Sequence, residues 1–199
     1  MKGSYRLLFG PIAAIILALG IVGLALFIPG YSHVRQTVSE IGEAGSPTRV
    51  PFAIMLGSVA ACLLVFAGGV SDLSARNGHS RSAAWLIGFM AISAAGVGVF
   101  AYPHPLHNVF GLSELVGYQA PIVMALTWKN DPRAKTLVTI SWILFVVIWL
   151  AIALNLSSLV PAIWLHVRPV RGLLQRALFA AWFGWCAIVG SILFELRST

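Results

Sequence analysis

Charged residues are scarce in this sequence, and their scarcity limits the class of protein. Only 10% of the 199 residues are charged, whereas 59% are hydrophobic. A soluble domain of this size could not cover so much apolar surface with polar side chains. The composition therefore argues against a water-soluble globular protein and indicates a membrane protein.

Cysteine is nearly absent, and no run of basic residues occurs. Cys62 and Cys186 both fall in the middle of apolar stretches and lack CxxC spacing, so neither a disulfide framework nor a thiol redox motif is predicted. The net charge of +7 comes from single Lys and Arg residues scattered over the loops. That pattern favours membrane lipids as partners and argues against nucleic acid.

Long apolar stretches fill the chain instead. They cover residues 7–28, 51–70, 83–101, 106–128, 136–159 and 173–194. An α-helix rises about 1.5 Å per residue, so about 20 residues cross a hydrocarbon core of roughly 30 Å. The first stretch is too long for a signal-peptide core and has no small-residue cleavage site before Pro29, so we expect a retained helix. The sequence predicts an all-α polytopic membrane protein, a single domain over residues 1–199 built as a bundle of six transmembrane helices.

The basic residues favour one orientation of this bundle. Eight of them fall on the side of the termini: Lys2, Arg6, Arg76, Arg81, Lys129, Arg133, Lys135 and Arg197. Five fall on the opposite side: Arg35, Arg49, Arg168, Arg171 and Arg176. Because Lys and Arg are enriched in cytoplasmic loops, both termini are expected in the cytoplasm. The connections near residues 29–50, 102–108 and 157–172 are then the outer ones.

The first outer connection is too long for a simple turn and too polar to span the membrane. Its polar residues recur at helical spacing, as His33, Gln36, Glu40 and Glu43. An apolar stripe lies opposite, at Val34, Val38 and Ile41, and Ser32 is a suitable N-cap. We therefore expect a short amphipathic helix lying at the outer interface.

The fourth stretch carries the strongest polar signal. A single helical stripe contains His107, Gly111, Glu114, Tyr118 and Pro121. A carboxylate about two turns inside a membrane is costly, so Glu114 should face the bundle interior, either as a functional group or as a packing element. We expect His33 or Arg176 to approach this stripe. Arg176 lies one turn into the sixth stretch. The alternative to its approach is that its side chain extends along the helix to place the guanidinium at the outer interface.

Small residues suggest close packing between helices. Gly57 and Ala61 occur in the second stretch, and Ala91, Ala95, Gly96 and Gly98 in the third. Such positions let helix backbones approach closely in lipid. They are consistent with a compact monomeric bundle or with a homodimer through one of these faces.

Two outer segments resemble a known family. The first carries Tyr31, Ser32, Ser39, Glu40, Gly42, Gly45 and Pro47. The second carries Tyr102-Pro103 and then His107, with His104 where the family commonly has an acidic residue. The chain thus resembles the six-helix prokaryotic integral membrane family catalogued as domain of unknown function 998. The resemblance implies a multi-pass protein of the prokaryotic plasma (inner) membrane with an outer polar site, and it implies no activity.

Three functions fit these residues. The first is an outward-facing pocket that binds a lipid headgroup or small polar ligand, lined by Tyr31, His33, Glu40, His107, Glu114, Tyr118 and Arg176. The second is a metal-dependent membrane hydrolase whose zinc ligands come from His33, His104, His107 and His166, although their spacing matches no recognised motif. The third is proton-coupled transport of a small solute through Glu114.

Catalysis by a serine nucleophile is not predicted. Ser39-Glu40 and Ser113-Glu114 each place a hydroxyl beside a carboxylate. Neither pair has a Gly-flanked elbow or a histidine at a known spacing. Whether the protein is an enzyme stays open at this point.

Overall fold

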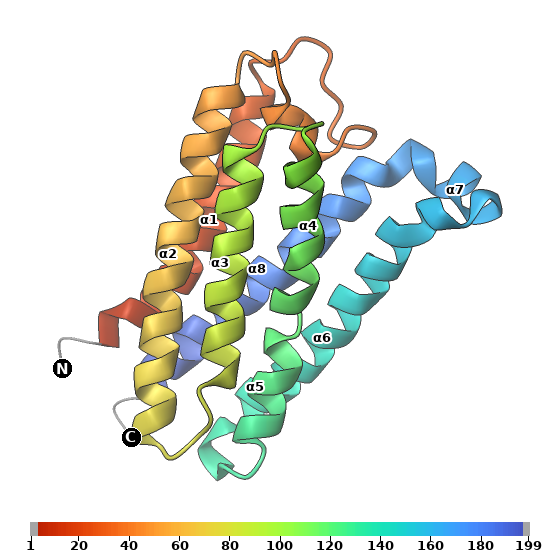
Figure 1. Ribbon diagram of the computed structural model, residues 1–199. Helices are drawn as coiled ribbons and strands as arrows, with labels where there is room; N and C mark the ends of the chain where they lie inside the picture. The colour runs from red at the N-terminus through yellow and green to blue at the C-terminus, as the bar shows by residue number, and fades with distance from the viewer. Residues whose placement is uncertain (1–3, 197–199) are drawn as a thin grey trace.

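The computed structural model describes residues 4–196, and every regular element in that range is helical (Figure 1). The α-helices are α1 (Phe9–Ala25), α2 (Arg49–Arg76), α3 (Ser82–Val99), α4 (Pro105–Gly117), α5 (Ala120–Trp128), α6 (Lys135–Asn155), α7 (Pro161–Val167) and α8 (Arg171–Leu196). Short 3-10 helices are η1 (Ser4–Leu8), η2 (Val38–Gly42), η3 (Pro132–Ala134), η4 (Leu156–Leu159) and η5 (Arg168–Val170). In this range, 6 helical segments are long and apolar enough to cross a membrane, which confirms the predicted fold class.

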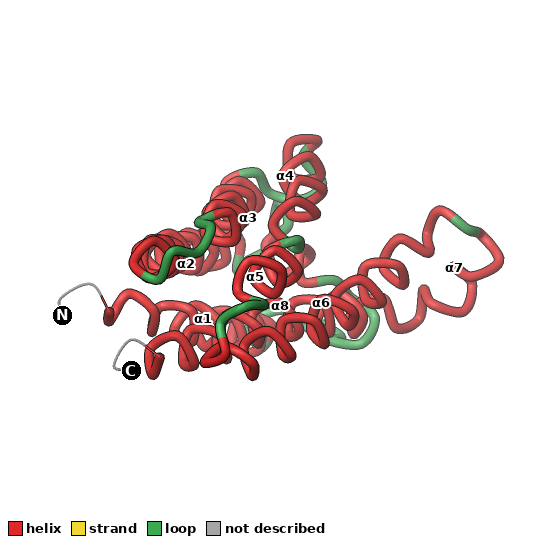
Figure 2. The backbone as a smooth tube through the Cα atoms, turned by 90° about the horizontal axis from the view of Figure 1, so that it is seen from below, coloured by secondary structure: helices red, strands yellow, loops and turns green. Residues whose placement is uncertain are grey.

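The helices form two layers that differ at their two edges. Figure 2 shows α2, α3 and α4 in one layer, α1, α8 and α6 in the other, and α5 between them. Contacts between α1 and α2 close one edge of the pair of layers. At the other edge, α4 packs on α3, whereas α6 packs on α5 and α8. The layers are therefore held apart where α4 and α6 face each other.

A proline divides the fourth membrane segment into α4 and α5. Pro121 has no N–H to donate to the carbonyl four residues earlier, which belongs to Gly117. That carbonyl instead accepts a hydrogen bond from the indole Nε1 of Trp182 on α8, at 3.3 Å. The break lets α5 leave the layer of α4 and pack against α6.

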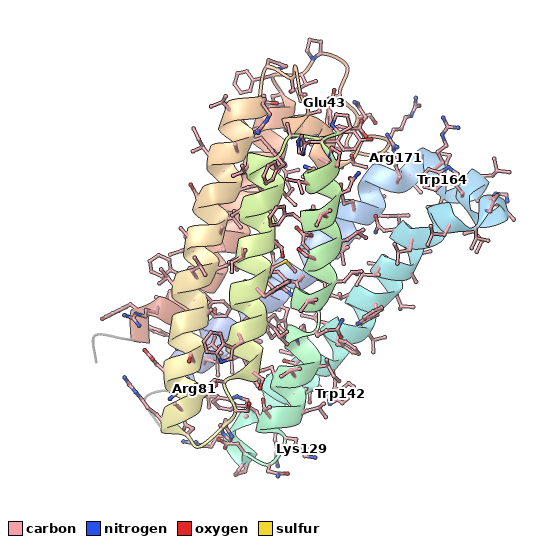
Figure 3. The ribbon with its side chains drawn as sticks, viewed as in Figure 1. Glu43, Arg81, Lys129, Trp142, Trp164 and Arg171 are labelled. Carbon is pink, nitrogen blue, oxygen red and sulfur yellow. The ribbon has the colours of Figure 1, made fainter. Side chains whose placement is uncertain are left out.

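The two ends of the bundle have different contents. We call the end that carries residues 26–48 the loop end, and the opposite end the termini end, because the ring centroids of Tyr5 and Phe194 lie 6.0 Å apart there. Figure 3 shows Glu43 and Arg171 at the loop end and Arg81 and Lys129 at the termini end. Lys2 and Arg197, counted among the basic residues of the termini side, lie outside the described residues.

The first loop differs from its prediction. It contains only the 3-10 helix η2, with Thr37 rather than Ser32 as N-cap and Glu40 completing a capping box. Before it, the Gln36 side chain accepts from the Ser32 backbone N–H at 2.8 Å, which closes a turn in place of a longer helix. The loop packs against α1, α2 and α8, and Val38 and Ile41 are buried. The predicted amphipathic helix is thus too long, because side-chain bonds hold residues 32–36 in a turn.

The third connection is more helical than its composition suggests, since it contains α7 between two 3-10 turns.

The small residues also fall into two groups. Ala91, Gly96 and Gly98 of α3 are buried inside the bundle. Gly57 and Ala61 of α2 are exposed, so their face stays available to the predicted homodimer.

Candidate functional site

A cavity of about 570 Å³ lies between α4, α6 and α8, at the edge where the two layers separate. Its polar lining comes from Ser39, His107, Asn108, Glu114, Tyr118, Asn155 and Gln175. Its apolar lining comes from Val97, Leu112, Leu115, Ile152, Leu156, Leu178 and Phe179. The cavity therefore offers a polar surface and an apolar surface to the same occupant.

His107 is fixed at one position on the cavity wall. It lies in the first turn of α4, which begins at Pro105 after His104 caps the helix by accepting from the Leu106 N–H at 3.2 Å. The His107 side chain is only 5% exposed. Its Nδ1 is 2.7 Å from the Phe100 carbonyl oxygen, and its Nε2 is 3.0 Å from Ser39 Oγ.

The Phe100 carbonyl determines the protonation of the neutral His107 ring. A carbonyl oxygen can only accept, so Nδ1 must carry the proton and donate it. The lone pair of the neutral ring is then on Nε2, and the Ser39 hydroxyl donates to it. Ser39 comes from η2 in the first loop, 68 positions before His107, so this contact joins two distant segments.

The predicted stripe on the fourth membrane segment lines the cavity with four of its five members. They are His107, Gly111, Glu114 and Tyr118. Tyr118 Oη donates to Glu114 Oε2 at 3.1 Å. A Cβ atom added at Gly111 would meet no atom within 4 Å, so the wall is open beside Glu114. The fifth member, Pro121, is buried in α5 beyond the helix break.

Arg176 has a different environment from the one expected beside Glu114. Its guanidinium donates to the backbone carbonyls of His33 at 2.9 Å and Gln36 at 2.8 Å, and to Tyr31 Oη at 2.6 Å. Tyr31 in turn donates to the Thr37 carbonyl at 2.7 Å. These bonds form a cluster that holds the first loop on α8, and the approach of His33 or Arg176 to the stripe of α4 stays a prediction.

The titratable groups of this cluster respond to their surroundings. Burial raises the pKa of the Tyr31 hydroxyl, although the hydrogen bond from Arg176 opposes the shift. Burial, and then the positive charge of Arg176, lower the pKa of His33. Both shifts favour the uncharged form, which is the neutral ring for His33 and the protonated hydroxyl for Tyr31.

Glu40 also has a structural role in the loop. Its Oε1 accepts from the Thr37 backbone N–H at 3.2 Å and from the Arg171 guanidinium at 2.7 Å. These bonds fix η2 against the start of α8. Among the predicted site residues, Tyr31, His33, Glu40 and Arg176 thus position the loop, whereas His107, Glu114 and Tyr118 line the cavity.

Four polar cavity residues were missed by the sequence analysis: Ser39 as a partner of His107, Asn108, Asn155 and Gln175. Gln175 Oε1 accepts from the Val38 backbone N–H at 2.6 Å, directly before Ser39. For two of them the sequence did contain a signal, because Asn155 and Gln175 are each the only side-chain amide in their apolar stretch. An uncharged amide is less costly in a membrane than a carboxylate, so it is a weaker pointer to a site.

Comparison with known families identifies the group to which the chain belongs. A family model described as protein of unknown function (DUF998) matches residues 11–192. The chain belongs to this family. No curated protein and no solved structure matches it. The matched range covers every residue that lines the cavity, so the cavity lies wholly within the DUF998 domain.

The histidines of this DUF998 protein do not gather in the structure. His33 contacts Tyr31 edge-on, His104 caps α4, His107 bonds Ser39, and His166 is exposed on α7. Within residues 4–196, no group of three or more His, Cys, Asp or Glu side chains is placed to hold a metal ion. The zinc site therefore stays a prediction from the sequence, without a geometric basis in these helices.

Proposed function

We propose that this DUF998 protein binds an amphipathic lipid in the cavity between α4, α6 and α8. The observation that carries the proposal is the cavity lining, which joins hydrogen-bonding groups to an apolar wall at one edge of the bundle. Ligand sites are commonly concave, mostly apolar and oriented by a few polar groups. This cavity has both features.

The size of the cavity limits what it accepts. At about 570 Å³ it lies within the range of small-molecule pockets, roughly 300–1,000 Å³. It would enclose a headgroup and the first part of an acyl chain, with the rest of the chain remaining in the bilayer. Glu114, Asn155 and Gln175 offer acceptors and donors to the headgroup, and Leu178 and Phe179 offer contact to the chain.

We further propose that the protein lies in a prokaryotic plasma membrane with both termini in the cytoplasm. The eight basic residues on the termini side against five on the other support this orientation. The cavity would then open in the half of the bilayer that faces away from the cytoplasm, and its occupant would come from the outer leaflet.

Gly111→Phe tests lipid binding directly. The added ring should fill the cavity beside Glu114, because open space surrounds the Gly111 Cβ position. Gly57→Phe is the matched control, since Gly57 is also helical with open space around it but lies on the surface of α2. After purification in a mild detergent, lipid extraction and mass spectrometry should find one bound lipid class in wild type and in Gly57→Phe. Gly111→Phe should retain about tenfold less.

Equal lipid retention by all three proteins would contradict this proposal, as would a wild-type protein that carries no lipid. Retention of a water-soluble small molecule instead would assign the cavity to a polar ligand.

A further inference from the structure

The contact between Ser39 and His107 has the arrangement of an activated nucleophile. A hydroxyl donates to a histidine Nε2 at 3.0 Å, and a third group orients the ring from its other side at 2.7 Å. This is the geometric signature of covalent catalysis by serine, with a nucleophile, a base within hydrogen-bond reach and an orienting acceptor. Here the orienting acceptor is the Phe100 carbonyl rather than a carboxylate.

The pair also lies where a substrate would reach it. Ser39 and His107 both line the cavity, together with the apolar side chains that would contact an acyl chain. The other hydroxyl next to a carboxylate, Ser113, lacks such a partner. It hydrogen-bonds Ser93 Oγ at 2.7 Å and the Phe110 carbonyl at 2.7 Å.

The Gln175 amide, which lines the same cavity as the pair, is the candidate donor for the developing negative charge. The Val38 backbone N–H can only donate, so the atom of Gln175 that faces it is the acceptor Oε1. The bond fixes the Gln175 amide through Oε1, and the Val38 bond does not use the two N–H donors on Nε2. Preorganised amide donors of this kind stabilise an oxyanion during acyl transfer.

We infer that this DUF998 protein is an acyl-ester hydrolase of membrane lipids, with Ser39 as nucleophile and His107 as general base. The inference rests on the proposed binding of a lipid in the same cavity. In the first step Ser39 Oγ forms a bond with the ester carbonyl carbon while its proton moves to His107 Nε2. The carbonyl oxygen takes the negative charge, close to the Gln175 amide.

The remaining steps release both products. As the carbonyl re-forms, the bond to the ester oxygen breaks, and His107 Nε2 returns its proton to the leaving alcohol. A water molecule then attacks the acyl-Ser39 carbonyl and gives its proton to Nε2. As the second tetrahedral species collapses, the bond from the acyl carbon to Ser39 Oγ breaks, His107 Nε2 returns its proton to Ser39 Oγ and the fatty acid leaves, so ester and water become acid and alcohol.

An alkyl fluorophosphonate probe tests the nucleophile without knowledge of the natural substrate. Ser39 Oγ should bond to phosphorus as fluoride leaves, and intact-mass and peptide analysis should find one adduct on Ser39. Ser39→Ala should abolish the adduct, and His107→Gln should slow its formation at least about 100-fold. Ser113→Ala is the matched control and should label like wild type.

The outcomes separate this inference from lipid binding. Bound lipid without a Ser39 adduct would overturn the inference and leave the proposed function intact. A Ser39 adduct that a short-chain probe forms in a protein that retains no lipid would support the nucleophile and contradict the proposed function. A Ser39 adduct that forms equally fast in His107→Gln would overturn the role of His107. If His107→Gln loses its fold, as judged by its melting temperature, His107→Asn takes its place and the same slowing is expected.

Discussion

Polar residues gather at both ends of the bundle, and the cavity between α4, α6 and α8 lies toward one of them, the loop end. At the termini end, Asp131 accepts from the Arg133 side chain at 2.9 Å and lies 3.3 Å from His79 Nε2. Arg133 also donates to Asn77 at 2.9 Å, and the His79 ring lies tilted against the Trp128 ring, with 4.0 Å between the centroids. These contacts join the α2–α3 loop to the α5–α6 loop.

The loop end contains a similar cluster around Arg176, and beside it the cavity. In the clusters at the two ends, most polar groups hydrogen-bond one another and so join the connections between helices, although Trp128 Nε1 and Arg176 Nε are buried without a partner. Ser39, His107, Glu114 and Gln175 instead face a space large enough for a ligand. In this protein the dense polar clusters join the connections between helices, whereas the polar side chains around the cavity are those on which the proposed lipid binding depends.

The helix break at Pro121 explains why the two ends differ. Beyond the break, α5 packs on α6 and fills the space between the layers near the termini end. Before it, α4 packs on α3 (Figure 1), and the cavity lies between α4 and α6. Pro121 thus separates two halves of this edge of the bundle: the half in which α5 packs on α6, and the half that contains the cavity.

The largest expected difference between the ends is their exposure in intact cells. We predict that a cysteine from Ala44→Cys at the loop end reacts with a membrane-impermeant maleimide, and that one from Asn130→Cys at the termini end does not. Both residues are exposed in the structure. The wild-type protein gives the background labelling, because its own cysteines, Cys62 and Cys186, belong to the long apolar helices α2 and α8. Labelling of Asn130→Cys alone would reverse the orientation and place the cavity on the cytoplasmic side.

Arg176→Met should give the largest loss of stability. The substitution leaves the carbonyls of His33 and Gln36 and the Tyr31 hydroxyl without their donor. Bonds to a charged donor contribute about 1.5–3 kcal/mol each, but the solvent-facing loop can recover part of this, so we expect a loss of about 3 kcal/mol. That loss lowers the melting temperature by about 5–10 °C, measured by thermal unfolding in detergent.

Arg168→Met is the control for this prediction, because Arg168 is exposed in the short η5 turn. Its change should stay within about 0.5 kcal/mol. If Arg176→Met and Arg168→Met both have the melting temperature of wild type, the Arg176 cluster does not hold the loop.

The sequence was sufficient to predict the helical spans, because apolar length alone determines them. It also predicted that Glu114 and Arg176 are exceptional, because charge inside an apolar stretch is costly. Their partners were not predictable, since Arg176 binds backbone carbonyls of a loop 140 or more positions away. Backbone groups carry no residue-specific signal. The Ser39–His107 contact was missed for a related reason, because the two residues lie 68 positions apart in different segments and no sequence motif links them.

The smallest expected effect concerns Asp131 at the termini end. Bonds from Arg133, and more weakly from His79, hold the pKa of the Asp131 carboxyl well below its usual range. Because the folded pKa is depressed, the carboxylate stabilises the fold above the unfolded pKa, about 3.9, and this contribution is lost as pH falls toward the folded pKa. Asp131→Asn should therefore lower the melting temperature by about 2 °C at pH 7, and the difference from wild type should shrink steadily below pH 4. Asp72→Asn, which removes the more exposed partner of Arg6 at 3.2 Å, should change the melting temperature less than Asp131→Asn at every pH. A difference between Asp131→Asn and wild type that grows on acidification would show that Asp131 does not stabilise this end as a carboxylate.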